Sequence, residues 1–350
     1  MQKMSPYLSD KIKVISLIAI TMVIYIHTYY TEGENYTLFM SLQRFFGGVG
    51  LSGIANPLFY LISGYLFFIN INSVYECFPK IKKRFHTLFI PYILANTLAF
   101  ILYAFLDGIS RLSLALYNVV NFHILNWLQL DLITLLKNIY WEPVAFQLWF
   151  VRDMILFVLL TPIIFYILKF CSQKKWTSLL LLFILILYYF VTSHHVIWMA
   201  IGGIISMSNI INIAEYCPTK QKDIVMYISA AIFIFFVVCN SFNIYTLKYG
   251  YALFGVIAFW LLYDKIAKGQ LYCTNQKLAK ACSLSFFIYL IHEPILLIFK
   301  KVPLLIFNNE IALTIYFLTV PIVFVTITIF IGNLLRKYIP KFFSIYVGGR

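Results

Sequence analysis

Long apolar runs recur along the whole chain and constrain its fold more than any other feature. A transmembrane helix needs about 20 consecutive, mostly apolar residues. Runs of about that length cover residues 13–31, 50–71, 87–106, 147–169, 177–193, 196–213, 223–241, 246–263, 281–299 and 311–335. With 62% hydrophobic residues and a mean hydropathy of +0.87, the chain carries more apolar surface than a soluble domain can bury. The sequence therefore predicts an all-α polytopic membrane protein with about ten transmembrane helices.

The basic residues fall in short clusters between the apolar runs and orient the predicted spans. Of the 27 Lys and Arg residues, 20 lie on the side that carries both termini, six lie on the other side, and Arg152 lies within a span. Basic loops stay in the cytoplasm, so we expect both termini to be cytoplasmic in a cell (inner) membrane protein. Clusters placed in this way reflect topology, so the net charge of +14 does not indicate a nucleic-acid partner.

The domain organisation predicted from the sequence is simple. We expect one integral membrane domain over residues 1–350, with a first helix that is retained and with no appended soluble domain. The six cysteines lack CxxC spacing and histidine neighbours, so we expect reduced thiols and no metal site.

Residues 107–146 form a segment of mixed character on the predicted outer side. They are too polar to span the membrane and too apolar for a free loop. An amphipathic or re-entrant hairpin at the outer interface is the natural interpretation. Such a hairpin would roof a site that opens outward, or it would serve only as an interfacial anchor.

Ionisable residues inside predicted spans are the strongest functional signal. A charge in the hydrocarbon core costs several kcal/mol, about 2.5–3.5 on insertion scales, so such residues usually line a cavity. They are His27, Arg152, Asp153, His292 and Glu293. At about 1.5 Å of rise per residue, His27, Arg152 and His292 fall at similar depth in the outer half of the membrane. We therefore predict a shared polar pocket.

Each of these residues also has a structural interpretation. His27 alone would suit a hydrogen bond between helices. Arg152 and Asp153 could compensate each other locally, although neighbours on a helix point about 100° apart. Pro294 predicts a kink beside His292. Glu293 would orient that histidine, or it would pair with Lys300 or Lys301 at the interface.

Five sequence stretches resemble the acyltransferase-three family of integral membrane acyltransferases and cover nearly the whole chain. They are the SDKI…IH stretch at 9–27, PLFYLISGYLF at 57–67, RFHTLFIPY at 84–92, LWFVR at 148–152 and SFFIYLIH at 285–292. The resemblance implies ten helices, an acyl-CoA donor (acetyl-CoA first) on the cytoplasmic side, and an acceptor hydroxyl on a glycan or lipid-linked sugar. It also implies that His27 is the catalytic histidine. The family's arginine eleven residues earlier is Ser16 here, and Lys13 would supply that charge.

The predicted site follows from the chemistry of acyl transfer, which needs a base for the hydroxyl proton and a donor for the oxyanion. We assign His27 as the base, or as a covalent acyl carrier. Arg152 would hold the oxyanion or a phosphate of coenzyme A, and His292 would complete the pocket. The residues expected to bind substrate are Glu293, Asp153, Trp149 and Ser63, and those expected to bind the donor are Arg84, Lys83, Lys82 and Lys13. The basic run at 82–84 also has a purely topological interpretation.

A transporter, flippase or export component for a polysaccharide unit or small solute is the alternative function, since intramembrane His, Arg and Glu also mark transport pathways. Against it, the sequence shows no inverted repeat and no matched pair of broken helices. The partners expected for the enzyme are the lipid bilayer, a glycan acceptor and glycan-synthesis machinery.

Overall fold

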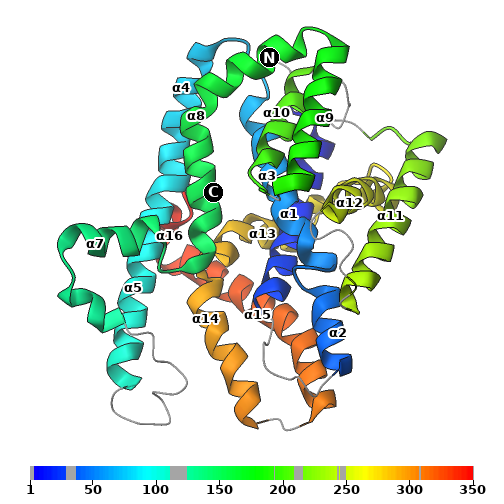
Figure 1. Cartoon of the computed structure of the whole chain (residues 1–350). Coiled ribbons are helices and arrows are strands. Elements are labelled where there is room, and N and C mark those ends of the chain that lie inside the picture. Colours follow the sequence, from blue (N-terminus) through cyan, green and yellow to red (C-terminus); the bar gives the residue numbers. More distant parts are fainter. Residues whose placement is uncertain are drawn as a thin grey trace. The chain divides into compact units, whose positions relative to one another are not determined.

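The structure, a computed structural model, describes residues 4–28, 37–110, 124–192, 194–208, 216–242, 244, 250–306 and 309–349. These residues form helices and connecting turns, and none of them lies in a strand (Figure 1). The α-helices are α1 Pro6–His27, α2 Thr37–Phe46, α3 Ala55–Phe68, α4 Cys77–Arg84, α5 Ile90–Ser110, α7 Leu132–Leu136, α8 Trp149–Ser172, α9 Lys175–Thr192, α10 Ile197–Ser208, α11 Lys220–Ser241, α12 Tyr251–Ala267, α13 Gln276–Ser283, α14 Ser285–Ile306, α15 Glu310–Tyr338 and α16 Pro340–Tyr346. The all-α prediction is confirmed for this part of the chain.

In the described part of the chain, six helical stretches are long and apolar enough to cross a membrane: Leu38–Phe68, Val74–Ile109, Phe146–Ser172, Lys175–Thr192, Lys220–Ser241 and Glu310–Tyr338. Each overlaps one predicted span, so the chain is a multi-pass membrane protein. The other four predicted spans fall on α1, α10, α12 and α14, and parts of the first three lie outside the described residues. The count of ten spans stays a prediction.

The chain divides into two compact units. Unit 1 consists of Met1–Lys80 and Leu160–Ser285, and unit 2 consists of Ile81–Leu159 and Phe286–Arg350. The single domain over 1–350 expected from the sequence stays a prediction.

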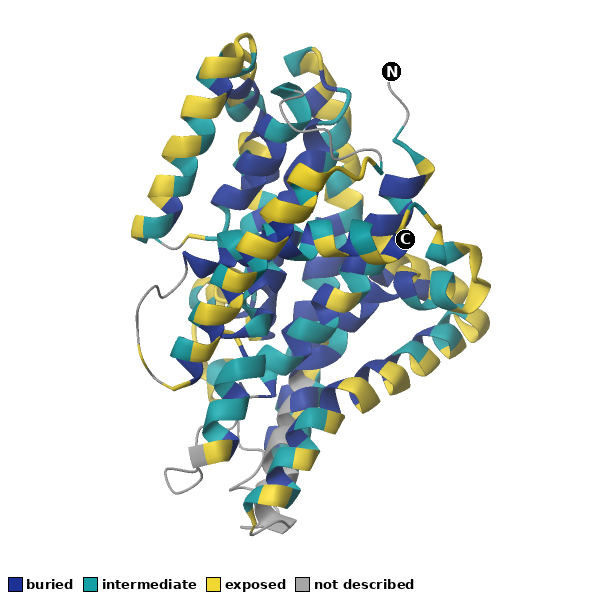
Figure 2. Ribbon diagram, turned by 90° about the vertical axis from the view of Figure 1, so that its right-hand side faces the viewer, coloured by how far each residue is buried: buried dark blue, intermediate teal, exposed yellow. Residues whose placement is uncertain are grey.

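The polarity of the long helices is reversed relative to a soluble protein. Along α9, Leu180, Phe183, Leu187 and Val191 recur every three or four residues and are 54–77% exposed. Ser178 and Tyr189 of the same helix are buried. Exposed residues run along the long helices beside buried ones (Figure 2). An exposed apolar stripe with polar groups turned inward suits a lipid environment.

Local sequence signals set the ends of the helices. At the start of α1, Ser5 accepts a hydrogen bond from the Leu8 N–H at 3.1 Å, and Pro6 occupies the first turn. Asn309 caps α15 in the same way, through the Ala312 N–H at 2.7 Å. These caps satisfy backbone N–H groups that have no partner within the helix.

The predicted kink in α14 is present. Glu293 has an extended backbone (φ −100°, ψ 136°) inside an otherwise helical segment. A proline disfavours the helical conformation at the residue before it, and Pro294 follows Glu293. The break therefore lies next to His292.

Two glycines let α3 and α10 approach closely in unit 1. A Cβ added to Gly64 would overlap the carbonyl oxygen of Met199, and one added to Gly202 would overlap that of Leu61. Small residues are what allow membrane helices to pack backbone against backbone.

The segment expected at the outer interface folds back along α5 within unit 2. Residues 111–123 lie outside the described residues, and the remainder includes a 3₁₀ helix (Ile124–Gln129) and α7. Asp107 of α5 accepts a hydrogen bond from the Leu125 N–H at 3.1 Å. At the other end of α5, Tyr92 donates to the Tyr140 carbonyl. Leu132 and Ile133 are 68% and 81% exposed, as an interfacial segment requires, and its place in the membrane stays a prediction.

Gly202→Ala tests the close α3–α10 packing. Because the new methyl group meets backbone rather than a mobile side chain, we expect a loss of about 1–3 kcal/mol and a lower apparent Tm in detergent. Gly108→Ala is the control, since a Cβ there meets nothing within 4 Å, and alanine favours a helix by about 1 kcal/mol. Equal Tm values for the two variants would contradict the packing.

Candidate active site

His27 is the last residue of α1, and the end of that helix is held firmly. It is half-buried. The next residue, Thr28, is 1% exposed, its backbone N–H donates to Ile24 at 2.9 Å, and its hydroxyl donates to Tyr25 at 3.0 Å. Tyr25 stacks on Phe46 with ring centroids 5.8 Å apart. These contacts fix the turn that carries the histidine.

A cavity of about 170 Å³ lies beside this end of α1, within unit 1. Ile26, the residue before His27, lines it together with Asn56 at the start of α3 and Tyr251 at the start of α12. Tyr189 near the end of α9 and His195 before α10 complete its polar wall. The sequence did not single out any of these residues as part of a site.

The opposite end of α1 holds a buried ion pair. Lys11 is 1% exposed, and its Nζ lies 2.7 Å from Asp264 Oδ1 of α12 and 4.0 Å from the centre of the Trp260 ring. The Tyr7 hydroxyl donates to the same oxygen at 2.6 Å. The carboxylate and the aromatic face together compensate the buried ammonium.

Asp10 is buried beside this pair and fastens α1 to a distant loop. It accepts hydrogen bonds from the backbone N–H groups of Tyr272 at 2.9 Å and Cys273 at 2.7 Å, and from the Tyr263 hydroxyl at 3.3 Å. By contrast, Lys13, the predicted substitute for the family arginine, is exposed. The buried cation of this helix is therefore Lys11, which the sequence analysis passed over.

Arg152 and Asp153 form an ion pair in unit 2. Arg152 Nε and Nη2 lie 3.1 Å and 3.0 Å from Asp153 Oδ1, and Nη1 donates to the Trp141 carbonyl at 2.8 Å. The expectation that these neighbours would not simply neutralise each other was wrong, because the long arginine side chain folds back over one residue. Three of its five N–H groups are engaged by described residues.

His292 and Glu293 lie at the break in α14, also in unit 2. The His292 ring is fully buried, and its Nδ1 lies 2.7 Å from the Tyr289 carbonyl. A carbonyl only accepts, so Nδ1 carries a proton. In a neutral imidazole with that tautomer, Nε2 is the acceptor. Glu293 is 6% exposed, and its carbonyl, released by the break, accepts a hydrogen bond from Gln147 Nε2 at 3.2 Å.

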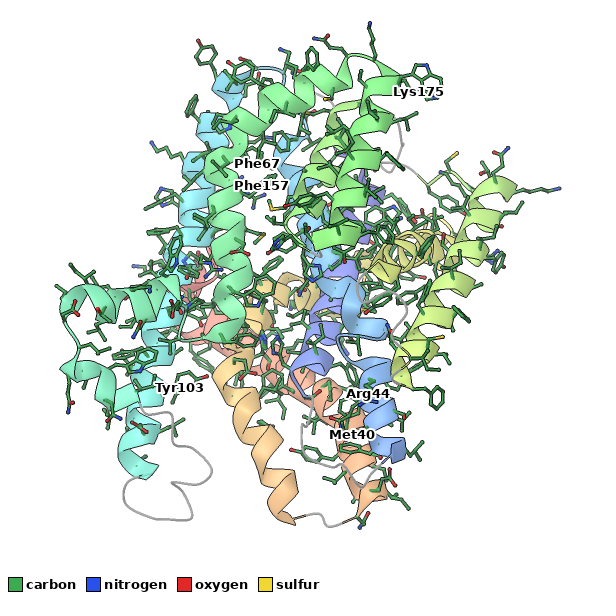
Figure 3. All side chains as sticks on the ribbon, in the orientation of Figure 1. Met40, Arg44, Phe67, Tyr103, Phe157 and Lys175 are labelled. Carbon is green, nitrogen blue, oxygen red and sulfur yellow. The ribbon has the colours of Figure 1, made fainter. Side chains whose placement is uncertain are left out.

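Tyrosines connect the polar groups of unit 2. The Tyr289 hydroxyl donates to the Gln147 carbonyl at 2.5 Å. The Glu293 carboxylate interacts electrostatically with Tyr103 of α5, which is 7% exposed and labelled in Figure 3. Asp153, which pairs with Arg152, also interacts electrostatically with Tyr289. A single site that contains Arg152, Asp153, His292 and Glu293 stays a prediction.

The remaining predicted site residues are more dispersed. Trp149 is half-buried at the start of α8 in unit 2, and Ser63 is half-buried in α3 of unit 1. Lys82 and Lys83 are exposed and Arg84 is half-buried at the end of α4. His27 belongs to unit 1 while Arg152 and His292 belong to unit 2, so a pocket shared by all three stays a prediction.

Among the described residues, no group of three His, Cys, Asp or Glu side chains could hold a metal ion. All six cysteines are free thiols.

Comparison with known proteins identifies the family. The family model of the acyltransferase domain matches residues 11–334. Over 370 residues the chain is 23% identical to the succinoglycan biosynthesis protein ExoH of Rhizobium meliloti (strain 1021), which covers 99% of this chain and 94% of that protein. No solved structure matches the chain.

Lys11→Met tests the buried ion pair. We expect a loss of about 2–3 kcal/mol, below the 3–5 kcal/mol typical of a buried pair, because Asp264 keeps 20% of its side chain exposed. The loss is measured as a lower Tm in detergent. Lys13→Met should leave Tm unchanged, and Lys11→Met/Asp264→Asn should recover part of the loss. A double variant no more stable than Lys11→Met would contradict the pairing.

Proposed function

The chain belongs to the membrane acyltransferase family, and we propose that it transfers an acetyl group from cytoplasmic acyl-CoA to a hydroxyl of a cell-surface glycan or lipid-linked sugar. The observation that carries the proposal is the family match over nearly the whole chain, with His27 at a fixed helix end beside a polar cavity. Similarity to a protein of succinoglycan biosynthesis supports a polysaccharide acceptor.

In the proposed reaction His27 is the general base. The acceptor oxygen attacks the thioester carbonyl, a C–O bond forms, the C–S bond breaks, and His27 passes the hydroxyl proton to the departing sulfur. The products are the sugar ester and the free thiol of coenzyme A. A helix C-terminus carries partial negative charge, so the end of α1 favours an imidazole that gains a proton during the reaction.

The polar region of unit 2 has a proposed role in charge stabilisation and acceptor binding. Arg152 keeps two N–H groups that no described residue engages, which suits an oxyanion. His292 is proposed to accept a hydrogen bond from a substrate hydroxyl, and Glu293, Asp153 and Trp149 are proposed to bind the same substrate. Ser63 of unit 1 is proposed to contact the substrate from α3.

The donor needs cations for its phosphate groups. Lys82, Lys83 and Lys13 are exposed, and Arg84 is half-buried. Accessible ammonium and guanidinium groups fit phosphate recognition, so we propose these four as the donor-binding residues. The proposed orientation places both termini in the cytoplasm of a cell-membrane protein.

His27→Ala should abolish the surface ester. Cells producing wild type or variant at equal protein level are compared by mass spectrometry of glycan esters released by mild alkali. Loss of a general base lowers the rate about 10²–10⁴-fold, so the ester should vanish. His86→Ala is the control, because His86 is exposed and has no proposed role.

Equal ester with wild type and His27→Ala would remove His27 from the chemistry. Glycan that reaches the surface only when the protein is present, without any ester, would instead establish the export function.

His292→Asn separates chemistry from folding. The asparagine amide can replace Nδ1–H as the donor to the Tyr289 carbonyl, but it has no atom at the position of Nε2. We expect an unchanged Tm and at least a tenfold loss of transfer. His292→Ala, which loses both nitrogens, should lower Tm as well. Full activity of His292→Asn would exclude a role for Nε2.

A further inference from the structure

The cavity at the end of α1 is assembled from separate helices of unit 1. Ile26 comes from α1, Asn56 from α3, Tyr189 from α9 and Tyr251 from α12, while His195 precedes α10. One water needs about 10–15 Å³ of such a volume, so about 170 Å³ accommodates about 11–17 non-hydrogen atoms. That is close to the size of one sugar ring with its hydroxyl groups.

The described residues in the wall of this cavity are uncharged and combine polar with apolar groups. The carboxamide of Asn56 and the imidazole of His195 can each donate and accept hydrogen bonds. Both side chains are half-buried. Burial, followed by the charge of His194, lowers the pKa of His195 to about 4, so the ring is neutral at physiological pH. Among the described residues, no Lys, Arg, Asp or Glu lines the cavity, so this lining does not suit the phosphates of coenzyme A or an acyl group with a free carboxylate.

Aromatic packing keeps the wall rigid. Tyr189 is 1% exposed and lies against Trp198 and His195, with ring centroids 5.4 Å and 5.9 Å apart. On the opposite side the Tyr251 hydroxyl donates to the Gly48 carbonyl at 3.0 Å. Aromatic rings with polar edges give a flat apolar surface together with hydrogen-bonding atoms. Sugars have the matching combination of C–H faces and hydroxyl edges.

We infer that this cavity is a subsite for the acceptor and takes one neutral sugar residue of the glycan, with Asn56 and His195 hydrogen-bonded to its hydroxyls. His27, directly after Ile26, then meets the hydroxyl that receives the acyl group. Asn56 and His195 are specificity-determining residues in this assignment. The inference rests on the proposed acyl transfer.

A kinetic assay with purified protein in nanodiscs tests whether the cavity binds the acceptor. The donor is radiolabelled acetyl-CoA, and the acceptor is surface glycan from the same cells after removal of its esters by mild alkali. Asn56→Ala and His195→Asn should each raise the KM for glycan about three- to tenfold, the effect of losing one hydrogen bond, and leave the KM for acetyl-CoA unchanged. Asn72→Ala and His194→Asn are matched controls, since both side chains are exposed.

The possible outcomes test the acceptor assignment separately from the proposed acyl transfer. Wild-type transfer with a raised glycan KM only in the two cavity variants supports the assignment. Wild-type transfer with an unchanged glycan KM, or with a raised acetyl-CoA KM, overturns the acceptor site and leaves acyl transfer standing. No transfer by wild type rejects the proposed function, and the acceptor site with it. A Tm measured for each variant identifies any that fails to fold, and the other cavity variant then decides.

Discussion

A polar atom in the hydrocarbon layer must find its hydrogen bonds inside the protein, because lipid offers none. Many polar side chains in these helices meet this requirement on their own helix. Ser241, Thr319 and Thr326 each donate to the carbonyl four residues earlier, at 2.7–2.8 Å. Such bonds satisfy the side chain without joining one element to another. The polar residues that bond across elements are therefore the informative ones.

Two sets of these cross-element bonds organise the candidate site. In unit 1, Asp10 and Lys11 fasten the start of α1 to α12 and to the loop at 272–273. In unit 2, the side chain of Gln147 donates a hydrogen bond to the Glu293 carbonyl, which the break in α14 releases. In both cases a group that would be costly alone is compensated by a partner far away in sequence. The start of α1 and the break beside His292 are held in place for this reason.

The sequence predicted the features that depend on local or repeated patterns. The length of the apolar runs predicted the long spans, and the proline after Glu293 predicted the break in α14. Both predictions follow from rules that act within one segment. It did not predict that Lys11 rather than Lys13 is buried. Both residues lie at the start of the same helix, and only the position of Asp264, some 250 residues later, distinguishes them.

Rules that act within one segment did not predict how far a flexible side chain reaches or which residues line a cavity between helices. The angle between neighbours on a helix suggested that Arg152 and Asp153 point apart, but the flexible arginine spans that angle and pairs with Asp153. Asn56, Tyr189 and His195 belong to no sequence motif. Only the packing of several helices around the cavity shows that they line it. The shared pocket of His27, Arg152 and His292 depends on the arrangement of two units and stays a prediction.

The two ends of α1 suggest how one helix serves both substrates of the proposed reaction. Lys13 and His27 are 14 residues apart, which is about 21 Å along a helix. The phosphates of the donor would bind near the basic end, while the acceptor hydroxyl meets His27 at the other. The thioester must therefore reach most of the way along α1, and the long, flexible pantetheine arm of coenzyme A is the part of the donor that can do so. A rigid α1, fixed at Asp10 and Lys11 and capped by Thr28, then sets the distance over which the acyl group is presented.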